Sequence, residues 1–160
     1  MNTPETINIH VRGASKKRFT IDGDPNKIIE LNTSDLDILG RLQDGLAKLQ
    51  ANMDKVMQLK TDKLDSEDVD DEYVKNFTEG LRACDKEMRE IVDMIFNSKV
   101  ADVCDGGGTM YDPIKEADSD PRYKVIIDDL IPLYNDDIAE QAKTMSARQA
   151  AYTKKYTKKK

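Results

Sequence analysis

The sequence predicts a mainly helical α+β protein, in which a small N-terminal antiparallel β-meander precedes a long helical hairpin and a kinked C-terminal helix. Three observations indicate this fold class. Apolar residues between positions 39 and 56 recur in steps of three and four, as on one face of a helix. A second ladder with the same spacing follows a highly charged break. Within residues 7–31, apolar and polar side chains alternate at 7–12 and at 18–21, as in half-buried strands.

The β-meander is expected over residues 7–31. Apolar and polar residues alternate from Ile7 to Val11, and Phe19 and Ile21 repeat the alternation after a break. Residues 22–26, which are rich in Asp, Gly and Pro, predict a turn before a third apolar run at 28–31. Because so small a sheet is only marginally stable alone, we expect it to pack against a helix or to join a sheet of another subunit.

The first long helix is predicted over residues 34–60. The polar segment Asn32–Asp35 is typical of a helix start. Gly40 and Gly45 lie inside the helix, where each costs about 1 kcal/mol relative to alanine. They either allow another helix to approach closely or are simply tolerated. The apolar ladder consists of Leu39, Leu42, Leu46, Leu49, Met53 and Val56.

The second long helix is predicted over residues 67–98. Residues 61–72 hold seven acidic residues and one lysine, and Ser66 is the expected N-cap. Its ladder consists of Tyr73, Phe77, Leu81, Cys84, Met88, Ile91 and Ile95. Two ladders joined by a short charged connection predict a helical hairpin whose apolar faces need partners.

A third helix is predicted over residues 121–145, with Pro121 in its first turn and Asp120 as its cap. Pro132 is expected to kink it. Its apolar stripe consists of Tyr123, Ile127, Leu130, Tyr134 and Ile138. Residues 1–140 are expected to form a single α+β domain, and residues 146–160 a basic tail that frays.

The charge of the chain is unevenly distributed. The net charge is −6, and residues 141–160 contain seven cations and no acid, so residues 1–140 carry −6 − 7 = −13. The tail is expected to be solvated, with an anion- or nucleic-acid-contacting arm as the alternative. Since the acidic body would repel a duplex, nucleic acid is not expected as a partner. No apolar run of 18 residues and no signal-like N-terminus occur, so we expect a soluble, unexported protein with no membrane partner.

No motif in the sequence reaches the specificity of a catalytic, cofactor or metal signature, so no enzyme, cofactor or metal site is predicted. The glycine run 106–108 lacks the Lys-Ser/Thr pair of a phosphate loop and is interpreted as a hinge. Asp22, Asp24 and Asn26 match the first spacings of a calcium loop, but the sixth position is not glycine, which favours a turn. His10 is interpreted as an exposed strand residue.

The apolar stripes are the candidate partner-binding surface. Methionines in the stripes have flexible thioethers, which either fill the core or form an adaptable groove for an apolar helix. Packing and self-association are assigned to the first two helices, and the stripe of the third helix is expected to be available to a partner. The candidate residues are Leu46, Leu49, Met53, Met88, Ile91, Tyr123, Ile127, Leu130, Tyr134 and Ile138.

Two segments resemble tail assembly chaperones of phages that infect Gram-positive bacteria. The first is Lys17-Arg18-Phe19-Thr20-Ile21-Asp22-Gly23-Asp24, followed by the apolar run 28–31 and the segment 32–35. The second is Arg122-Tyr123-Lys124-Val125-Ile126-Ile127-Asp128-Asp129-Leu130, followed by the lysine-rich end. In layout the resemblance covers most of the chain.

The resemblance implies a helix-rich, self-associating, non-enzymatic protein of the infected host cytoplasm. Such a chaperone keeps the tape measure protein soluble while the tail tube polymerises around it, and it is not expected in the mature virion. The resemblance transfers no catalytic residues. The alternatives are a structural or connector protein of the virion, an acidic host-directed inhibitor and an enzyme.

Overall fold

The computed structural model describes residues 6–7, 16–59, 61–67 and 69–157. It confirms the predicted α+β class, because a two-stranded antiparallel sheet precedes long helices. In chain order the elements are β1 (Lys17–Ile21), β2 (Asp24–Leu31), α1 (Ile38–Met57), α2 (Asp71–Phe96), β3 (Pro113–Ile114), the 3-10 helix η1 (Lys115–Ala117), β4 (Asp120–Pro121), α3 (Arg122–Leu130) and α4 (Pro132–Thr157).

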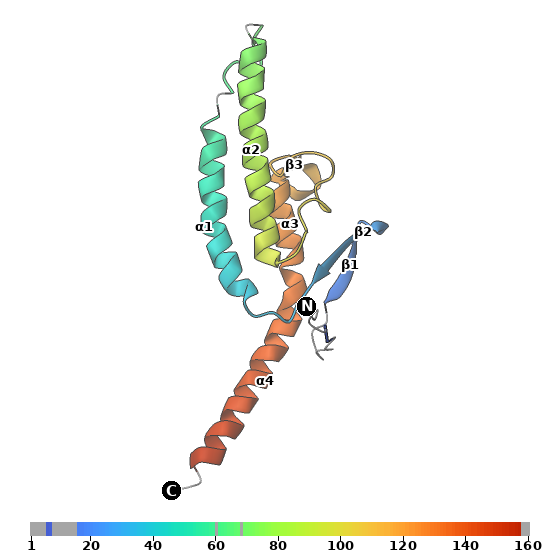
Figure 1. Cartoon of the computed structure of the whole chain (residues 1–160), viewed down its shortest axis with the longest axis vertical. Helices are drawn as coiled ribbons and strands as arrows, with labels where there is room; N and C mark the ends of the chain where they lie inside the picture. Colours follow the sequence, from blue (N-terminus) through green and yellow to red (C-terminus); the bar gives the residue numbers. More distant parts are fainter. Residues whose placement is uncertain (1–5, 8–15, 60, 68, 158–160) are drawn as a thin grey trace, which may run out of the picture.

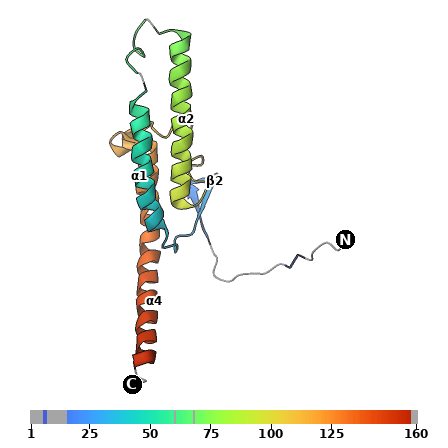
Figure 2. The same ribbon diagram turned by 60° about the vertical axis from the view of Figure 1, so that its left-hand side comes forward.

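The molecule is elongated (Figures 1 and 2). The helices α1 and α2 lie side by side as an antiparallel hairpin whose connection forms one end of the molecule. The sheet and α3 pack near the C-terminal half of α2, and α4 extends away from this body to form the other end. The hairpin tip and the C-terminal end of α4 are therefore far apart.

The strands β1 and β2 form the hairpin that the alternating pattern predicts. Phe19 lies opposite Ile29 and Thr20 opposite Ile28, with an irregularity between Thr20 and Ile21. The turn needs only Asp22 and Gly23, at φ of 53° and 71°, a left-handed conformation that suits short hairpin turns. The strand predicted around residues 7–11 and His10 lie outside the described residues except for Ile7, which is exposed.

The helix α1 begins four residues later than predicted, at Ile38 and not at residue 34. Polar side chains of the preceding segment form local turns instead, because Asn32 Oδ1 accepts from the Ser34 amide at 3.3 Å and Asp35 Oδ1 from the Asp37 amide at 3.0 Å. Such side-chain-to-backbone bonds compete with helix formation.

The bounds of α2 also differ from the predicted range 67–98. The N-cap is Asp70, whose Oδ1 accepts from the Tyr73 amide at 2.7 Å, and not Ser66. The helix ends at Phe96 because Asn97 adopts a left-handed conformation with φ of 48°. Asp93 Oδ1 then accepts from the Val100 and Ala101 amides at 2.8 and 2.9 Å, which turns the chain away from the helix axis.

The predicted kink at Pro132 is confirmed, since α3 ends at Leu130 and α4 begins at Pro132. Asp120 does not cap α3; it lies in the small β3–β4 ladder, which the sequence did not predict, and pairs with Lys124 at 2.9 Å. The helix α4 continues to Thr157, so the expected fraying from residue 146 needs correction. Residues of high helix propensity, such as Ala147, Ala150 and Ala151, account for the longer helix.

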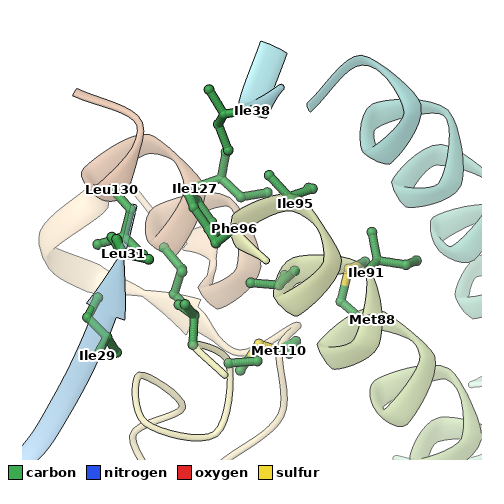
Figure 3. Packing of buried hydrophobic residues seen from close by; sticks show 14 of the residues in the cluster. Ile29, Leu31, Ile38, Met88, Ile91, Ile95, Phe96, Met110, Ile127 and Leu130 are labelled. Atoms are coloured by element: carbon green, nitrogen blue, oxygen red, sulfur yellow. The ribbon is translucent and has the colours of Figure 1, made fainter. Parts of the chain in front are cut away.

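One apolar core lies where the C-terminal half of α2 meets β2, α3 and the start of α4 (Figure 3). The sheet contributes Ile29 and Leu31, which confirms that the sheet packs against helices. The segment after α2 adds Val100, Ala101 and Met110. The buried residues of the helices are Ile38, Leu49, Met88, Ile91, Val92, Ile95, Phe96, Ile126, Ile127, Leu130 and Tyr134.

The two glycines of α1 have different environments. Gly45 is buried against α2, and a Cβ atom built on it would lie 2.5 Å from Ile95 Cγ1 and 2.6 Å from Ile95 Cδ1. A Cβ atom on Gly40 would meet only Asp37 Oδ1, at 3.5 Å. Gly45 therefore permits the close approach of α1 to α2, whereas Gly40 is tolerated at an open position.

We expect opposite effects from alanine at these glycines. Gly40→Ala should raise the free energy of unfolding by about 0.5–1 kcal/mol, since alanine has the higher helix propensity. Gly45→Ala should lower it by about 1–2 kcal/mol, because the collision with Ile95 outweighs that gain. Urea unfolding followed by circular dichroism measures both, and equal stabilisation by the two substitutions would contradict a tight α1–α2 contact at Gly45.

Candidate functional site

The structure divides the ten candidate partner-binding residues by exposure. Six are at most 8% exposed and belong to the core: Leu49, Met88, Ile91, Ile127, Leu130 and Tyr134. Three are partly buried against it: Met53, Tyr123 and Ile138. Leu46 alone among the ten is exposed, at 55%. The stripe from Tyr123 to Ile138 is therefore not left open to a partner as expected, because α3 and the start of α4 pack on the body with this face.

Five of the ten residues nevertheless meet in a groove between α1 and α3. The groove has a volume of about 260 Å³. From α1 it is lined by Leu46, Leu49, Gln50 and Met53, and from α3 by Tyr123, Lys124, Ile127 and Asp128. These positions recur at three and four residues on both helices, so each helix presents one face to the groove.

The groove exists because α1 and α3 each have another helix to pack against. The main helix contact of α1 is with α2, and α3 contacts α2 and α4. Leu49 and Ile127 are buried at 6% and 8% exposure, and they form the deep part of the groove. Leu46 stands at its margin with more than half of its side chain exposed. The surface thus keeps apolar area that the chain itself does not cover.

At the polar margin of the groove, Lys124 forms ion pairs with two carboxylates. Lys124 Nζ lies 2.7 Å from Asp128 Oδ2 and 2.9 Å from Asp120 Oδ2. The hydrogen bonds to Asp128 and Asp120 raise the pKa of the Lys124 ammonium above its ordinary value. The Tyr123 ring packs edge-on against Tyr111, with centroids 6.4 Å apart and an interplanar angle of 73°. Burial raises the pKa of the Tyr123 hydroxyl, which therefore stays neutral near pH 7.

A polar network between α1, α2 and the segment after α2 fixes the position of α1 relative to α2. Asn52 is fully buried, and its Nδ2 donates to the Cys84 carbonyl oxygen at 3.0 Å and to Glu87 Oε2 at 3.2 Å. Its Oδ1 accepts from the Tyr111 hydroxyl. Lys55 Nζ completes the network with Glu87 at 2.9 Å. Every polar atom of the Asn52 side chain amide thus takes part in joining α1, α2 and the segment after α2.

Arg89 holds the segment that contains the glycine run. Its guanidinium lies 2.9 Å from carboxylate oxygens of Asp85, Asp102 and Asp105 and donates to the Gly108 carbonyl oxygen at 2.8 Å. Burial alone would lower the pKa of Arg89, but the hydrogen bonds to Asp85, Asp105 and Asp102 outweigh it, so the pKa lies above its ordinary value. Arg89 therefore holds the loop with residues 106–108 against α2. We replace the interpretation of this segment as a flexible hinge with that of a loop held by hydrogen bonds and ion pairs.

The two cysteines are free thiols; Cys84 is buried and Cys104 is partly buried. Burial raises the pKa of Cys84, and burial raises the pKa of Cys104 to about 11. Both side chains are therefore thiols near neutral pH, and the thiolate, which is the nucleophilic form, is disfavoured.

The segment from Asp22 to Asn26, which was compared with a calcium loop, contains a turn and the start of β2. Asp22 belongs to the β1–β2 turn, and Asp24 Oδ1 accepts from the Asn26 amide at 2.9 Å, as the turn interpretation expects. Within the described ranges, no group of three or more His, Cys, Asp or Glu side chains could hold a metal ion. In the same part of the chain, no helix has the length and apolar character needed to cross a membrane.

Sequence reasoning missed the polar residues that join the elements of the fold. Asn52 and Arg89 fall within the predicted helices, and the sequence signal for them is a polar residue close to the apolar ladder. Asp137 was also missed; it accepts from the Thr33 hydroxyl and from Lys17 Nζ at 2.8 Å, which joins α4 to the sheet. These hydrogen bonds lower the pKa of the Asp137 carboxyl.

Comparison with known proteins produced no match: no protein-family model, no curated protein and no solved structure corresponds to this chain.

Proposed function

We propose that this protein is a non-enzymatic tail assembly chaperone, and that an amphipathic helix of the tape measure protein binds in the groove between α1 and α3. The observation that carries the proposal is the groove itself. It brings exposed and partly buried apolar side chains of two helices together at helical spacing, with Leu46 at its margin. The resemblance of the segments 17–24 and 122–130 to phage tail assembly chaperones supplies the class of client.

The shape of the groove supports a helical client. A trough between two helices accepts the apolar face of a third, with anchors at i, i+3, i+4 and i+7. A tape measure protein is long and helical, so it would aggregate unless its apolar stripes were covered. The groove is small, at about 260 Å³, and Gln50, Lys124 and Asp128 give it polar edges. A small groove favours contacts weak enough to be released when tube subunits arrive. Several copies of the chaperone along one client would provide the necessary avidity.

Leu46→Glu should disrupt this interaction. A carboxylate at the groove margin would have to be desolvated against an apolar helix, so we expect client affinity to fall at least about tenfold, or about 1.4 kcal/mol. The matched control is Leu39→Glu, since Leu39 lies two helical turns earlier on α1 and is 58% exposed but does not line the groove. Pull-down of the co-expressed tape measure protein from the same genome, followed by titration calorimetry, measures both variants.

Two results would contradict the proposal. The first is a client that stays insoluble and unbound when co-expressed with the wild-type chain. The second is equal loss of binding in both variants, which would place the client elsewhere on α1. Mass spectrometry of purified particles adds an independent criterion, because a chaperone is expected to be absent from them and a structural protein of the virion present.

A further inference from the structure

The two ends of the elongated molecule carry opposite charge. At the hairpin tip, residues 61–72 contain seven acidic residues and one lysine. At the other end, residues 142–157 of α4 contain Lys143, Arg148, Lys154 and Lys155 and no acidic residue. Residues 142–155 are exposed throughout, so these cations lie on a helix that projects into solvent.

The projecting part of α4 also continues an apolar face. Tyr134 is buried in the body at 1% exposure, and Ile138 is partly buried. Met145 and Tyr152 follow at spacings of seven, which places them on the same side of the helix. They are 54% and 65% exposed. The apolar face that packs in the body thus continues beyond the body, where more than half of each of the Met145 and Tyr152 side chains is exposed.

The hairpin tip presents apolar surface among its acids. Met57, Leu64 and Val74 are 79%, 45% and 44% exposed. Beside them, Gln58, Leu59, Tyr73, Asn76 and Phe77 line a groove of about 340 Å³ between the ends of α1 and α2. The tip therefore combines an apolar groove with a negative margin, whereas α4 combines an apolar face with positive flanks.

We propose that the outer part of α4 in one copy of this chain binds the acidic hairpin tip of a second copy. The same helix cannot reach its own tip, because the two lie at opposite ends of the molecule in both views (Figures 1 and 2). The contact is head-to-tail, so each copy keeps one tip and one helix for the next copies. Repetition of such a heterologous contact produces open chains or a closed ring.

A second copy fits these two surfaces better than the other occupants. Pairing α4 with α4 in a symmetric dimer would bring like charges together, which is destabilising. A nucleic acid would satisfy the cations but would be repelled by residues 1–140, which carry −6 − 7 = −13. The tip supplies acidic and apolar groups together. This contact is distinct from the α1–α3 groove and does not depend on the client that occupies the groove.

Sedimentation of the nuclease-treated full chain tests the contact. In about 50 mM NaCl the weight-average mass should rise with protein concentration and pass that of two chains. In about 500 mM NaCl the apparent dissociation constant should be at least about tenfold higher, because the contact depends on exposed charges. A chain that stays monomeric at low salt, or one that stops at a salt-insensitive dimer, would overturn the proposal.

Charge reversal at each end provides a sharper test. The tail variant carries Lys143→Glu, Arg148→Glu, Lys154→Glu and Lys155→Glu, which changes the net charge of residues 141–160 from +7 to −1. The tip variant carries Asp62→Lys, Asp65→Lys, Glu67→Lys and Glu72→Lys, which changes the net charge of residues 61–72 from −6 to +2. All eight residues are exposed. Each variant alone should remain monomeric, because its two ends now have the same sign. An equimolar mixture should associate again, since every contact between the two variants joins opposite charges. Failure of the mixture to associate would refute the pairing of these ends.

Association through bound nucleic acid is the remaining outcome that would refute the head-to-tail contact. If wild-type association disappears after nuclease treatment and returns with a duplex oligonucleotide, the α4 cations bind phosphate and the proposal fails. Loss of client binding in Leu46→Glu without a change in sedimentation would leave the head-to-tail contact standing, so the two proposals fail independently.

Discussion

Replacing Tyr134 by alanine is expected to lower the free energy of unfolding by about 3–5 kcal/mol. Tyr134 is 1% exposed and packs against Phe96, with ring centroids 6.3 Å apart. It lies in the first turn of α4, directly after the break at Pro132. Its ring therefore fills the core and anchors α4 to the body, and its removal would leave a cavity that the surrounding helices close only in part.

Two control variants distinguish the effect of losing the Tyr134 ring from the effect of losing its hydroxyl and from that of a change at the neighbouring residue. Leu133→Ala changes the neighbouring residue, which is 37% exposed, and should cost less than about 1 kcal/mol. Tyr134→Phe keeps the ring, and the hydroxyl has no hydrogen-bond partner in the described part of the chain, so stability should change by less than about 1 kcal/mol. Denaturant titrations measure all three. A loss below about 1 kcal/mol in Tyr134→Ala would contradict the anchoring role.

Arg89→Ala should produce the second large effect, a loss of about 2–4 kcal/mol. The change removes the guanidinium but leaves the carboxylates of Asp85 and Asp105, which are 16% and 28% exposed, partly buried without their cation. Asp102 is 77% exposed and contributes little, which keeps the expected loss below that of a fully buried network. Released loop residues should show faster amide hydrogen exchange around Met110, whose amide donates to Asp85.

The same substitution should change the acid sensitivity of the fold. Burial acts to raise the pKa of the Asp105 carboxyl, but the Gly107 amide and Arg89 outweigh it and hold the pKa below its ordinary value. A depressed pKa adds stability above the unfolded-state pKa of about 3.9, and this contribution is lost as pH falls through the folded value. The stability difference between wild type and Arg89→Ala should therefore shrink below about pH 4.

Arg82→Ala is the matched control, because Arg82 lies two turns earlier on α2 and is exposed. The free energy of unfolding of Arg82→Ala should stay within about 0.5 kcal/mol of that of the wild type at every pH. A similar loss in both variants, or a stability difference that does not change with pH, would show that Arg89 does not act through its carboxylates.

The order of the long helices was predictable because each carries its own periodic pattern. In α2 the ladder residues Cys84, Met88, Ile91 and Ile95 are all buried, as the spacing indicates. The helix ends were less predictable. Side chains such as Asn32 and Asp35 bind the backbone locally and delay α1, and the sequence pattern does not distinguish such a turn from a cap.

The candidate site was only partly predictable. The ladders contain Leu46, Leu49, Met53, Tyr123 and Ile127, which the structure brings together in one groove. They could not separate these residues from Met88, Leu130 and Tyr134, which the core buries. Asn52 and Arg89 were missed because the structural role of a polar residue depends on partners that are distant in the chain. A periodic pattern carries no information about such partners.

The sequence by itself determined the α+β class, the hairpin of β1 and β2, the faces of the helices, the kink at Pro132 and the opposite charges of the two ends. All of these follow from local spacing and composition. Only the tertiary structure decided which face is covered. The helix α2 lies at the centre and buries its ladder from Cys84 to Ile95, while α1 packs on one side of it and leaves Leu39 and Leu46 exposed. Burial depends on neighbours from distant segments, and a periodic pattern specifies a face without specifying its partner.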